Sequence, residues 1–320
     1  MVPEQALIER FVSEIDALIP PGSPIGIAVS GGPDSLALLL LATAARPGAI
    51  EAATIDHALR SDAREEAEMV SHLCRQLGVP HSILTAHWEE APETAIQERA
   101  RNERYRLLAY WAEERRLAGV ATAHHAEDQA ETLLMRLARG SGVRGLAGMR
   151  PKSVAPGAHV RLVRPLLGWR RAELEGICIQ AGVAPAKDPS NEDERFERVR
   201  VRRAIARADW LDPGAVARSA SNLADADEAL RWAAENEWRR SVDERRERIS
   251  YHQGDAPNEI VRRIVGRALR KLASEGEAEL RGGELDRLLA ILKQGGTGTL
   301  RGVQCSGGSV WQFERAAPRR

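Results

Sequence analysis

The sequence has little of what marks several broad classes of protein. Aromatic residues make up 4% of the 320 positions, and 46 basic residues balance 46 acidic ones. Zero net charge provides no global basic field, so any case for nucleic-acid binding must rest on local arginine clusters. No apolar run approaches the roughly 18 residues of a membrane helix, and the acidic N-terminal segment is unlike a signal peptide. We therefore expect no membrane partner.

Cysteine and lysine are scarce as well. Cys74, Cys178 and Cys305 are odd in number and far apart, and no C-x-x-C occurs. This spacing argues against disulfides, structural zinc and a cysteine-held cluster, and it favours reduced thiols in a cytoplasmic protein. Only four of the 46 basic residues are lysine, which genome composition is enough to explain.

What the chain does contain is an alternation of short apolar runs and helical patterns. The runs that predict strands span 25–29, 49–56, 80–86 and 120–125. The patterns that predict helices span 33–45, 61–77, 92–117 and 128–139. This alternation predicts an α/β fold with a parallel sheet and right-handed crossovers.

The character of the sequence changes after about residue 205. Residues 212–292 are charged and mostly helical in pattern, and residues 296–315 resemble a β-hairpin around Ser306-Gly307-Gly308. We expect a catalytic domain over 1–205. A smaller, mainly helical domain ending in a hairpin should follow over 206–320 and contact RNA.

Three polar stretches follow predicted strands, namely Ser30–Ser35, Asp56–Arg60 and His124–Asp128. Ligands of parallel sheets bind at the carboxyl ends of the strands. The three stretches are therefore expected to line one site.

The first stretch, Ser30-Gly31-Gly32-Pro33-Asp34-Ser35, has the composition of a phosphate-binding turn. Its glycines let the backbone approach a ligand, and the following helix offers free N–H groups. Neither G-x-x-x-x-G-K-[ST] nor G-x-G-x-x-G occurs here, which excludes the two commonest nucleotide loops. Asp34 would repel phosphate unless a cation bridges them, so it either helps to hold Mg²⁺ or stabilises the helix N-terminus. An ordinary glycine-rich turn is the alternative for the whole stretch.

The S-G-G-x-D-S pattern resembles the PP-loop of N-type ATP pyrophosphatases. The segment His124–Met149, HHAEDQAETLLMRLARGSGVRGLAGM, closely resembles the signature of tRNA(Ile)-lysidine synthetases. Glu127 stands where that family usually has Asp, whereas Asp128 matches the next acid. Residues 54–60, 98–108, 163–174 and 188–202 resemble further motifs of the family, with Val199 in place of a usual Asn.

The resemblance implies a Rossmann-like PP-loop domain and a ligase that forms a carbon–nitrogen bond. In that family ATP adenylates C2 of the cytidine at the first anticodon position of the CAU-anticodon isoleucine tRNA, which releases pyrophosphate. The amine of free L-lysine then displaces AMP. The lysidine formed pairs with A rather than G, so the codon read changes from AUG to AUA. Mg²⁺ is implied beside ATP, and a homodimer is left open.

Site residues follow from matching motif positions. The implied ATP-binding residues are Ser30, Gly31, Gly32, Pro33, Asp34, Ser35 and Asp56, and the implied catalytic residues are Asp34, Arg101, His125 and Asp128. Asp34 and Asp128 are also the expected Mg²⁺ ligands. Glu131 could orient the lysine ammonium or equally pair with Arg136. Arg101 could instead be a surface residue, and Asp56 a capping residue before a loop.

Two arginine groups are candidates for tRNA contact. Arg139 and Arg144 flank the glycines of RGSGVRG, which would allow a flexible loop. Arg195, Arg198 and Arg202 would share one face of a helix, as a stripe that tracks phosphates. A solvated, charged helix is the alternative.

Two other functions compete with this prediction. A PP-loop tRNA thiolase generally needs paired cysteines or a cluster for sulfur transfer, which this sequence does not offer. A catalytically degenerate RNA-binding relative would be expected to have a broken loop, whereas Ser30–Ser35 is intact.

Overall fold

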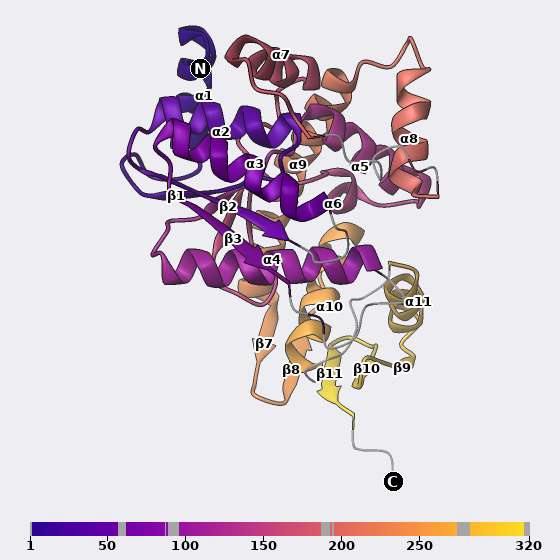
Figure 1. Ribbon diagram of the computed structural model, residues 1–320. Coiled ribbons are helices and arrows are strands. Elements are labelled where there is room, and N and C mark those ends of the chain that lie inside the picture. The colour runs from indigo at the N-terminus through magenta and orange to yellow at the C-terminus, as the bar shows by residue number, and fades with distance from the viewer. Residues whose placement is uncertain are drawn as a thin grey trace. The chain divides into compact units, whose positions relative to one another are not determined.

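The computed structural model describes residues 2–56, 62–86, 88, 96–186, 193, 195–273 and 282–316 (Figure 1). The chain divides into two compact units. One holds Met1–Gly140 with Gly145–Ser221, and the other holds Ser141–Arg144 with Asn222–Arg320. The division falls inside helix α9 (Pro213–Ser241). The domain boundary that the sequence suggests near residue 205 stays a prediction.

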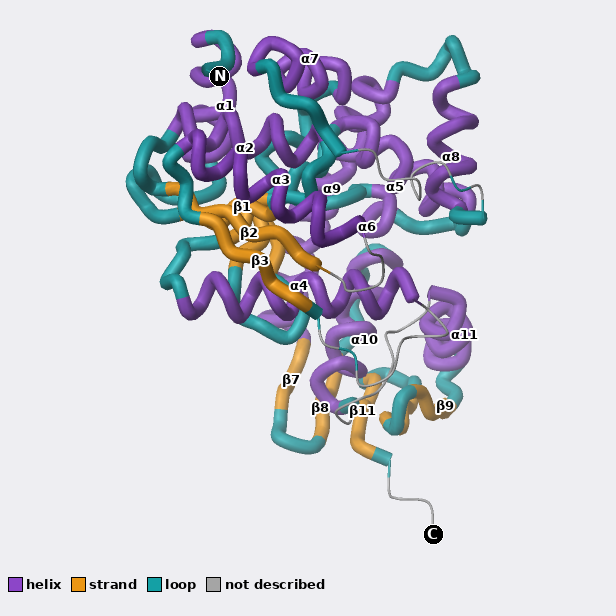
Figure 2. Tube along the Cα trace, viewed as in Figure 1, coloured by secondary structure: helices purple, strands orange, loops and turns teal. Residues whose placement is uncertain are grey.

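The N-terminal unit is built on a six-stranded sheet in the order β3-β2-β1-β4-β6-β5. Its strands are β1 (Ile25–Ala28), β2 (Ile50–Asp56), β3 (His81–Thr85), β4 (Val120–Ala121), β5 (Lys152–Val154) and β6 (Arg161–Val163). All neighbouring pairs are parallel except β5 with β6 at the edge. The predicted α/β fold with a mostly parallel sheet is confirmed (Figure 2).

Helices cover both faces of this sheet, and five of them contribute to its two cores. The helices up to residue 206 are α1 (Gln5–Asp16), α2 (Pro33–Ala45), α3 (Asp62–Leu77), α4 (Ile96–Glu114), α5 (Ala126–Ala138), α6 (Val143–Leu146), α7 (Arg171–Ala181) and α8 (Glu197–Ala206). One core joins α1, α2, α3 and α7 to the sheet, and a second core joins α4 to the other face (Figure 1). Helix α2 is apolar all round because α1 and α7 cover the side that faces away from the sheet.

The order of the strands creates a crevice at β1. Helices α2 and α3 carry the chain from β1 to β2 and β3 on one side, and α4 returns it across the other face to β4. Trp111 of α4 lies so close to β1 that a Cβ atom at Gly26 would sit 2.5 Å from its ring. The connections leave β1 and β4 in opposite directions, and this switch point is where open α/β sheets bind ligands.

The C-terminal unit has its own core and sheet. Helices α10 (Asn258–Leu272) and α11 (Gly282–Lys293) accompany the second part of α9. A five-stranded antiparallel sheet has the order β7-β8-β11-β10-β9, with β7 (Val242–Glu244), β8 (Arg248–Tyr251), β9 (Thr297–Leu300), β10 (Val303–Ser306) and β11 (Trp311–Arg315). Tyr251 and Trp311 pack edge to face in the core, with ring centroids 6.0 Å apart.

The predicted hairpin is confirmed as β10 and β11, paired from Val303 with Arg315 to Ser306 with Gln312. The sequence did not predict β7, β8 and β9, because strands of three or four residues carry too little periodicity. No helix in the described ranges is both long and apolar enough to cross a bilayer.

Candidate functional site

The loop after β1 is shaped by its own side chains. Gly31 adopts φ +84°, a conformation that strains other residues, and Gly32 and Pro33 begin helix α2. The Ser35 hydroxyl accepts a hydrogen bond from the Ser30 N–H at 3.1 Å and donates to the Gly32 carbonyl at 2.9 Å. The loop is thus held in a fixed curve against the first turn of α2, whose backbone N–H groups have no helical partners.

His125 joins this loop to the one after β4. It is 4% exposed and is the N-cap residue of α5. Its Nε2 lies 3.5 Å from an oxygen of Asp34 and 3.5 Å from an oxygen of Asp128. The Asp128 carboxylate also accepts the His125 backbone N–H at 3.1 Å, which fixes the start of the helix. Three of the predicted catalytic residues therefore meet at the switch point.

The charges around His125 make it a cation. Burial alone would lower the pKa of its imidazole, but the hydrogen bonds that the ring donates to Asp34 and Glu127, together with the charge of Asp128, raise that pKa to about 10. At neutral pH the ring is protonated and neutralises part of the negative charge between the two aspartates.

Glu127, the departure from the family pattern, points away from the loop toward α7. Its carboxylate accepts from His125 Nδ1 at 2.9 Å, from Arg170 Nε at 3.1 Å and from the Arg171 N–H at 3.0 Å. Burial favours its neutral form, but the bonds from His125 and Arg171 lower the pKa of Glu127 to about 2. Glu127 orients His125 and ties α5 to α7. The local sequence does not reveal the link to α7, because the partners of Glu127 there lie 43 and 44 residues away.

The neighbouring His124 is neutral, whereas His125 is positively charged. The predicted strand 120–125 ends at Ala121, so both histidines belong to the loop that follows it. Burial, reinforced by Arg164 and Arg104, lowers the pKa of His124 well below its usual range. Its Nδ1 lies 2.9 Å from Thr122 Oγ1. A neutral and a charged imidazole thus stand side by side.

A cationic cluster lies beside His124 on the α4 side. The guanidinium groups of Arg101 and Arg104 lie 5.2 and 5.0 Å from the centre of the Tyr105 ring. Burial favours neutral Tyr105, yet Arg104, Arg101 and Arg164 lower the pKa of its phenol. Arg164 is 7% exposed, and its Nε has no hydrogen-bond partner within the described residues. The cluster is suited to bind an anion. Arg164 lies in a motif noted in the sequence, but nothing in the spacing indicated its place.

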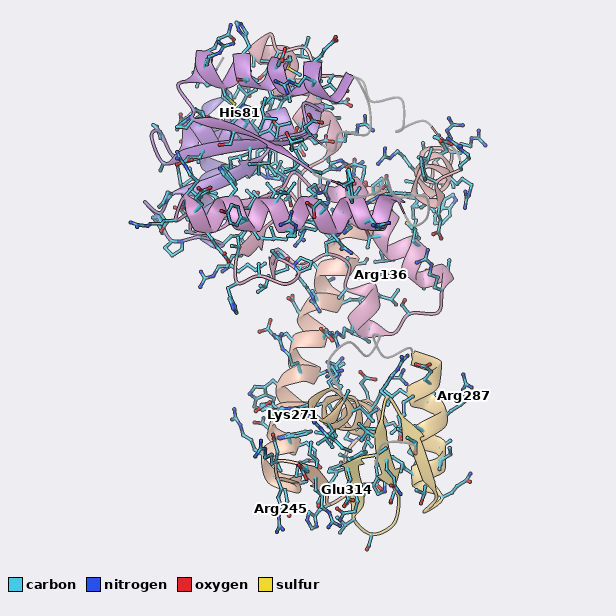
Figure 3. The ribbon with its side chains drawn as sticks, turned by 60° about the horizontal axis from the view of Figure 1, so that its bottom comes forward. His81, Arg136, Arg245, Lys271, Arg287 and Glu314 are labelled. Atoms are coloured by element: carbon cyan, nitrogen blue, oxygen red, sulfur yellow. The ribbon has the colours of Figure 1, made fainter. Side chains whose placement is uncertain are left out.

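Glu131 is the most buried carboxylate of the site, with a side chain 1% exposed. It accepts from Arg198 Nε and Arg202 Nε, each at 2.6 Å, and Arg198 also contacts Asp128 at 3.2 Å. The alternative prediction, a pairing of Glu131 with Arg136, is wrong. Arg136 donates instead to the carbonyls of Gly145 and Gly148, at 2.7 and 3.0 Å (Figure 3).

The predicted arginine stripe is also wrong in its geometry. Arg195 precedes α8 and pairs with Asp193, so it shares no helix face with the others. Arg198 and Arg202 point inward to Glu131 rather than outward to solvent. The spacing of the arginines shows that they share one side of a helix. It does not show whether that side faces the protein interior or solvent.

Part of the signature is structural rather than chemical. Gln129 of α5 donates to the Met149 carbonyl at 2.9 Å and accepts its N–H at 2.7 Å. A Cβ atom at Gly148 would lie 2.5 Å from the Gln129 side-chain oxygen, which explains the glycine there. With Arg136, Gln129 anchors the segment that ends RGSGVRGLAGM to α5.

The structure also describes Asp56, Arg139 and Arg144, but it does not bring them into contact with these residues. Asp56 ends β2 and is 7% exposed, but residues 57–61 are not described. Arg139 is exposed and pairs with Glu197 of α8, and Arg144 is exposed in α6. Much of the motif at 188–202 also lies outside the described residues, which resume continuously at 195.

The aspartates at the switch point fit a divalent metal. Asp34 Oδ1 is buried with no hydrogen-bond partner in the described part of the chain. The described residues contain no group of three or more side chains that could hold a metal ion by themselves. Mg²⁺ typically takes one or two carboxylates and completes its shell with water and substrate phosphates, so this arrangement fits Mg²⁺ better than a closed metal site.

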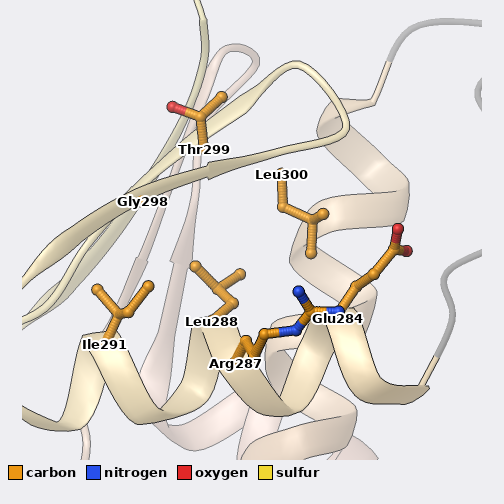
Figure 4. A pocket seen from close by; sticks show the side chains of 7 residues that line it. All are labelled: Glu284, Arg287, Leu288, Ile291, Gly298, Thr299 and Leu300. Carbon is orange, nitrogen blue, oxygen red and sulfur yellow. The ribbon is translucent and has the colours of Figure 1, made fainter.

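In the C-terminal unit, a groove of about 310 Å³ lies between α11 and β9 (Figure 4). Its lining is largely apolar, including Leu288, Ile291 and Leu300. The Glu284 carboxylate accepts from Arg301 at 2.9 Å. This groove lacks the convergent charged groups of the switch point, which is therefore the better candidate for chemistry.

Comparison with known proteins agrees with the geometry. The PP-loop domain family matches residues 5–208. The chain is 47% identical to the tRNA(Ile)-lysidine synthase of Novosphingobium aromaticivorans, over 97% of this chain and 94% of that protein. It is 41% identical to the protein of the same name from Zymomonas mobilis, over 100% and 96%.

Among solved structures, the U34-tRNA thiolase NcsA from Methanococcus maripaludis matches with a TM-score of 0.56 and 16% identity. The match covers 68% of this chain and 78% of the thiolase, and it shows a shared fold alone. The family matches cover most of the chain. The chain therefore belongs to the tRNA(Ile)-lysidine synthase family of PP-loop proteins.

Proposed function

We propose that this chain joins L-lysine to C2 of the cytidine at the first anticodon position of a CAU-anticodon isoleucine tRNA, using ATP. The observation that carries this proposal is the meeting of Asp34, His125 and Asp128 beside the PP-loop at the switch point. Family membership supplies the reaction class.

The PP-loop is proposed to cradle the triphosphate of ATP. The curve from Ser30 to Ser35 and the free N–H groups at the start of α2 suit phosphate oxygens. Asp34 and Asp128 would hold Mg²⁺, which when bound neutralises charge on the phosphates. Asp56, at the end of the neighbouring strand β2, is proposed to contact the nucleotide.

Adenylation needs cations where negative charge develops. The cytidine C2 oxygen attacks the α-phosphate and pyrophosphate leaves, so charge grows on the phosphate oxygens. Arg101, which belongs to the cationic cluster with Arg104 and Arg164, is proposed to stabilise such charge. Protonated His125 is proposed to attract both Asp34 and Asp128 and so to keep the two carboxylates in the position that the substrate requires.

The second step needs lysine as a neutral amine, although the amine of free lysine has a pKa of about 10.4. A proton must therefore leave it within the site. Glu131 is our candidate for orienting this amine. Its oxygens already accept from Arg198 and Arg202, so lysine would have to displace one guanidinium.

The test is direct. The folded protein is incubated with ATP, radiolabelled lysine and an unmodified transcript of the isoleucine tRNA. We expect label in the RNA, with AMP and pyrophosphate formed in equal amounts. The control is the same transcript with the first anticodon cytidine replaced by uridine, which should take up no label. Absence of label from the cytidine transcript, with folding verified by circular dichroism, would sink the proposal.

The same experiment separates the alternatives. A thiolase would transfer sulfur rather than lysine, and all three cysteines here are buried in α3, α7 and β10. Burial raises the pKa of the Cys74 thiol to about 12, which makes it a poor nucleophile. A degenerate relative would bind tRNA without consuming ATP. Free thiols also fit the reducing cytoplasm, where we place the reaction; a homodimer stays a prediction.

A further inference from the structure

Arg170 contacts two acids that belong to different elements. Its Nε donates to an oxygen of Glu127 on α5 at 3.1 Å, and its Nη1 donates to Asp212, which precedes α9. These partners lie 43 and 42 residues away in the sequence, one before Arg170 and one after it. Both donors belong to one rigid, planar guanidinium, so the side chain fixes the two carboxylates relative to each other.

On the side of α5, this contact leads to His125. The second oxygen of Glu127 accepts from His125 Nδ1 at 2.9 Å. The other ring nitrogen, Nε2, lies 3.5 Å from an oxygen of Asp34 and 3.5 Å from an oxygen of Asp128. An imidazole ring is rigid, so the partner that holds one nitrogen also sets where the other is presented. The position of Glu127 therefore determines how His125 meets the two aspartates.

On the other side, Arg170 meets the residue that caps α9. The Asp212 carboxylate accepts the N–H groups of Gly214 and Ala215, at 3.1 and 2.9 Å. A side-chain oxygen in this position stabilises the N-terminus of a helix. A Cβ atom at Gly214 would lie 2.8 Å from Arg170 Nη1, so the glycine makes room for the guanidinium. The glycine and the cap together place Asp212 within reach of Arg170.

The backbone around Arg170 is held independently of its side chain. The Arg170 N–H donates to the Glu173 carboxylate at 2.7 Å. The preceding residue, Trp169, is fully buried, and its carbonyl accepts the Ala126 N–H at 2.9 Å. These contacts survive truncation of the Arg170 side chain, so a variant at this position tests the guanidinium alone.

Stability gives a weak reason for the two ion pairs of Arg170. The side chain is 40% exposed, and ion pairs at such exposure contribute little to the free energy of folding. Orientation gives a stronger reason, because two separate N–H donors of one planar group reach two acids at once. A lysine ammonium in the same place has a single nitrogen and could not hold both.

We propose that Arg170 is a positioning residue of the reaction, which holds Glu127, and through it His125, in a fixed place relative to the start of α9. The proposal rests on the proposed function, since the reaction served is the formation of lysidine at the switch point. Arg170 acts through Glu127 rather than on the reacting atoms. Its loss should therefore slow the chemical step and leave the binding of tRNA intact.

The first experiment measures kcat and the KM for tRNA in lysidine formation. Arg170→Met keeps the length of the side chain but removes the guanidinium. We expect its kcat to fall by about 10-fold to 100-fold, as when a histidine that binds metal loses the outer partner that orients it. The KM for tRNA should stay unchanged. Arg170→Lys should recover only part of the lost kcat, because one nitrogen cannot reach both acids.

The next residue supplies a matched control. Arg171 pairs with Glu175 at 2.9 Å and is 44% exposed, and it contacts Glu127 only through its backbone N–H, which Arg171→Met retains. This variant should keep the wild-type kcat. The double variant Glu127→Gln/Arg170→Met should lose no more than the more damaged single variant, because both changes reach His125 by the same route. Fully additive losses would overturn the proposal.

A spectroscopic measurement separates this proposal from the proposed function. The chemical shift of His125 Nδ1, measured by NMR without substrates, should move in Arg170→Met and stay in Arg171→Met. An unchanged shift in Arg170→Met, or equal losses of kcat in the two variants, would show that Arg170 does not position His125. If the wild type forms no lysidine while the shift moves only in Arg170→Met, the proposed function fails and the link from Arg170 to His125 stands.

Discussion

His125 lies beside both aspartates of the candidate site. Asp34 and Asp128 lie in the first turns of α2 and α5, more than 90 positions apart, and two carboxylates brought close together repel each other. The imidazole lies 3.5 Å from an oxygen of each, and its pKa of about 10 keeps a positive charge between them. A single protonated side chain thereby holds the two acids of the site in register.

Asp34→Asn tests whether this acid serves chemistry or only the start of α2. The amide keeps the shape but removes the charge that Mg²⁺ and His125 would use. We expect lysidine formation to fall by about 100-fold to 1000-fold, the range for losing one well-placed electrostatic contact. The melting temperature should fall only slightly, because Asp34 Oδ1 has no hydrogen-bond partner among the described residues and His125, which loses the charge at Asp34 Oδ2, keeps Glu127 and Asp128 as counter-charges. Activity close to wild type would reduce Asp34 to a favourable charge at a helix N-terminus.

Glu127→Gln tests the orientation of His125. The variant loses the charged partner of Nδ1, so the pKa of His125 should fall below its wild-type value of about 10. Asp34 and Asp128 should still keep it above the ordinary value for histidine. The measurement is an NMR titration of the imidazole, with Glu65→Gln on exposed α3 as the control. An unchanged pKa would mean that Glu127 only ties α5 to α7.

At the level of elements, α5 organises the site. Its N-terminus carries His125 and Asp128, its buried side carries Glu131, and its side chains Gln129 and Arg136 clamp the segment 145–149. Helix α8 attaches to α5 through the pairs of Glu131 with Arg198 and Arg202. Helix α8 is therefore joined to the acids of the switch point through the buried carboxylate of Glu131.

Glu131→Gln measures the strength of this connection. Removing one partner from a buried ion pair costs about 3–5 kcal/mol, and the lower end applies because both arginines are about one-third exposed. We expect the free energy of unfolding, from urea titration, to fall by about 3 kcal/mol. Glu175→Gln, which breaks the exposed pair with Arg171, should cost less than about 0.5 kcal/mol. Equal losses in the free energy of unfolding for the two variants would show that the buried pairs of Glu131 stabilise the fold no more than an exposed pair does.

At the level of the whole molecule, each unit has its own hydrophobic core. The N-terminal unit holds the cores around α2 and α4, and the C-terminal unit holds the one around Trp311 and Phe313. The described residues of the switch point all belong to the N-terminal unit. That unit also contains two partly buried histidines with lowered pKa values, His81 on β3 (Figure 3) and His124.

These histidines predict how stability depends on pH. Above about pH 6.5, the ordinary pKa of histidine, folded and unfolded chains are both neutral at these positions. Below it the unfolded chain binds protons that the folded chain refuses, so the free energy of unfolding falls. The raised pKa of His125 affects stability at high pH instead. Its stabilisation of the folded state is complete below about pH 6.5 and is lost as the pH rises through about 10.

We therefore expect the urea midpoint to fall between pH 6.5 and 5, and to fall less in His124→Gln. Glu127 does not interfere in this window, because its ordinary pKa is about 4.3 and its folded value is lower still. The measurement is a series of urea titrations across the pH range. The same slope in wild type and variant would show that His124 accepts a proton in the folded state.

Local pattern predicted the sheet and the loops, because apolar runs and glycine-rich turns report structure within a few residues. It could not predict contacts made across long stretches of chain. Glu127 finds Arg170, and Glu131 finds Arg198 and Arg202, only after α7 and α8 have packed against α5. The short strands β7, β8 and β9 escaped prediction for the related reason that their pairing partners, rather than their own residues, define them.

By itself the sequence determined the fold class, the PP-loop and the family, since each is written in consecutive residues. Only the tertiary structure decided which arginines of α8 face Asp128 and Glu131 and which face solvent. Both sets satisfy the helical repeat, and the choice depends on the buried carboxylate of Glu131, which must be neutralised once α5 covers it. Arg198 and Arg202 meet that requirement.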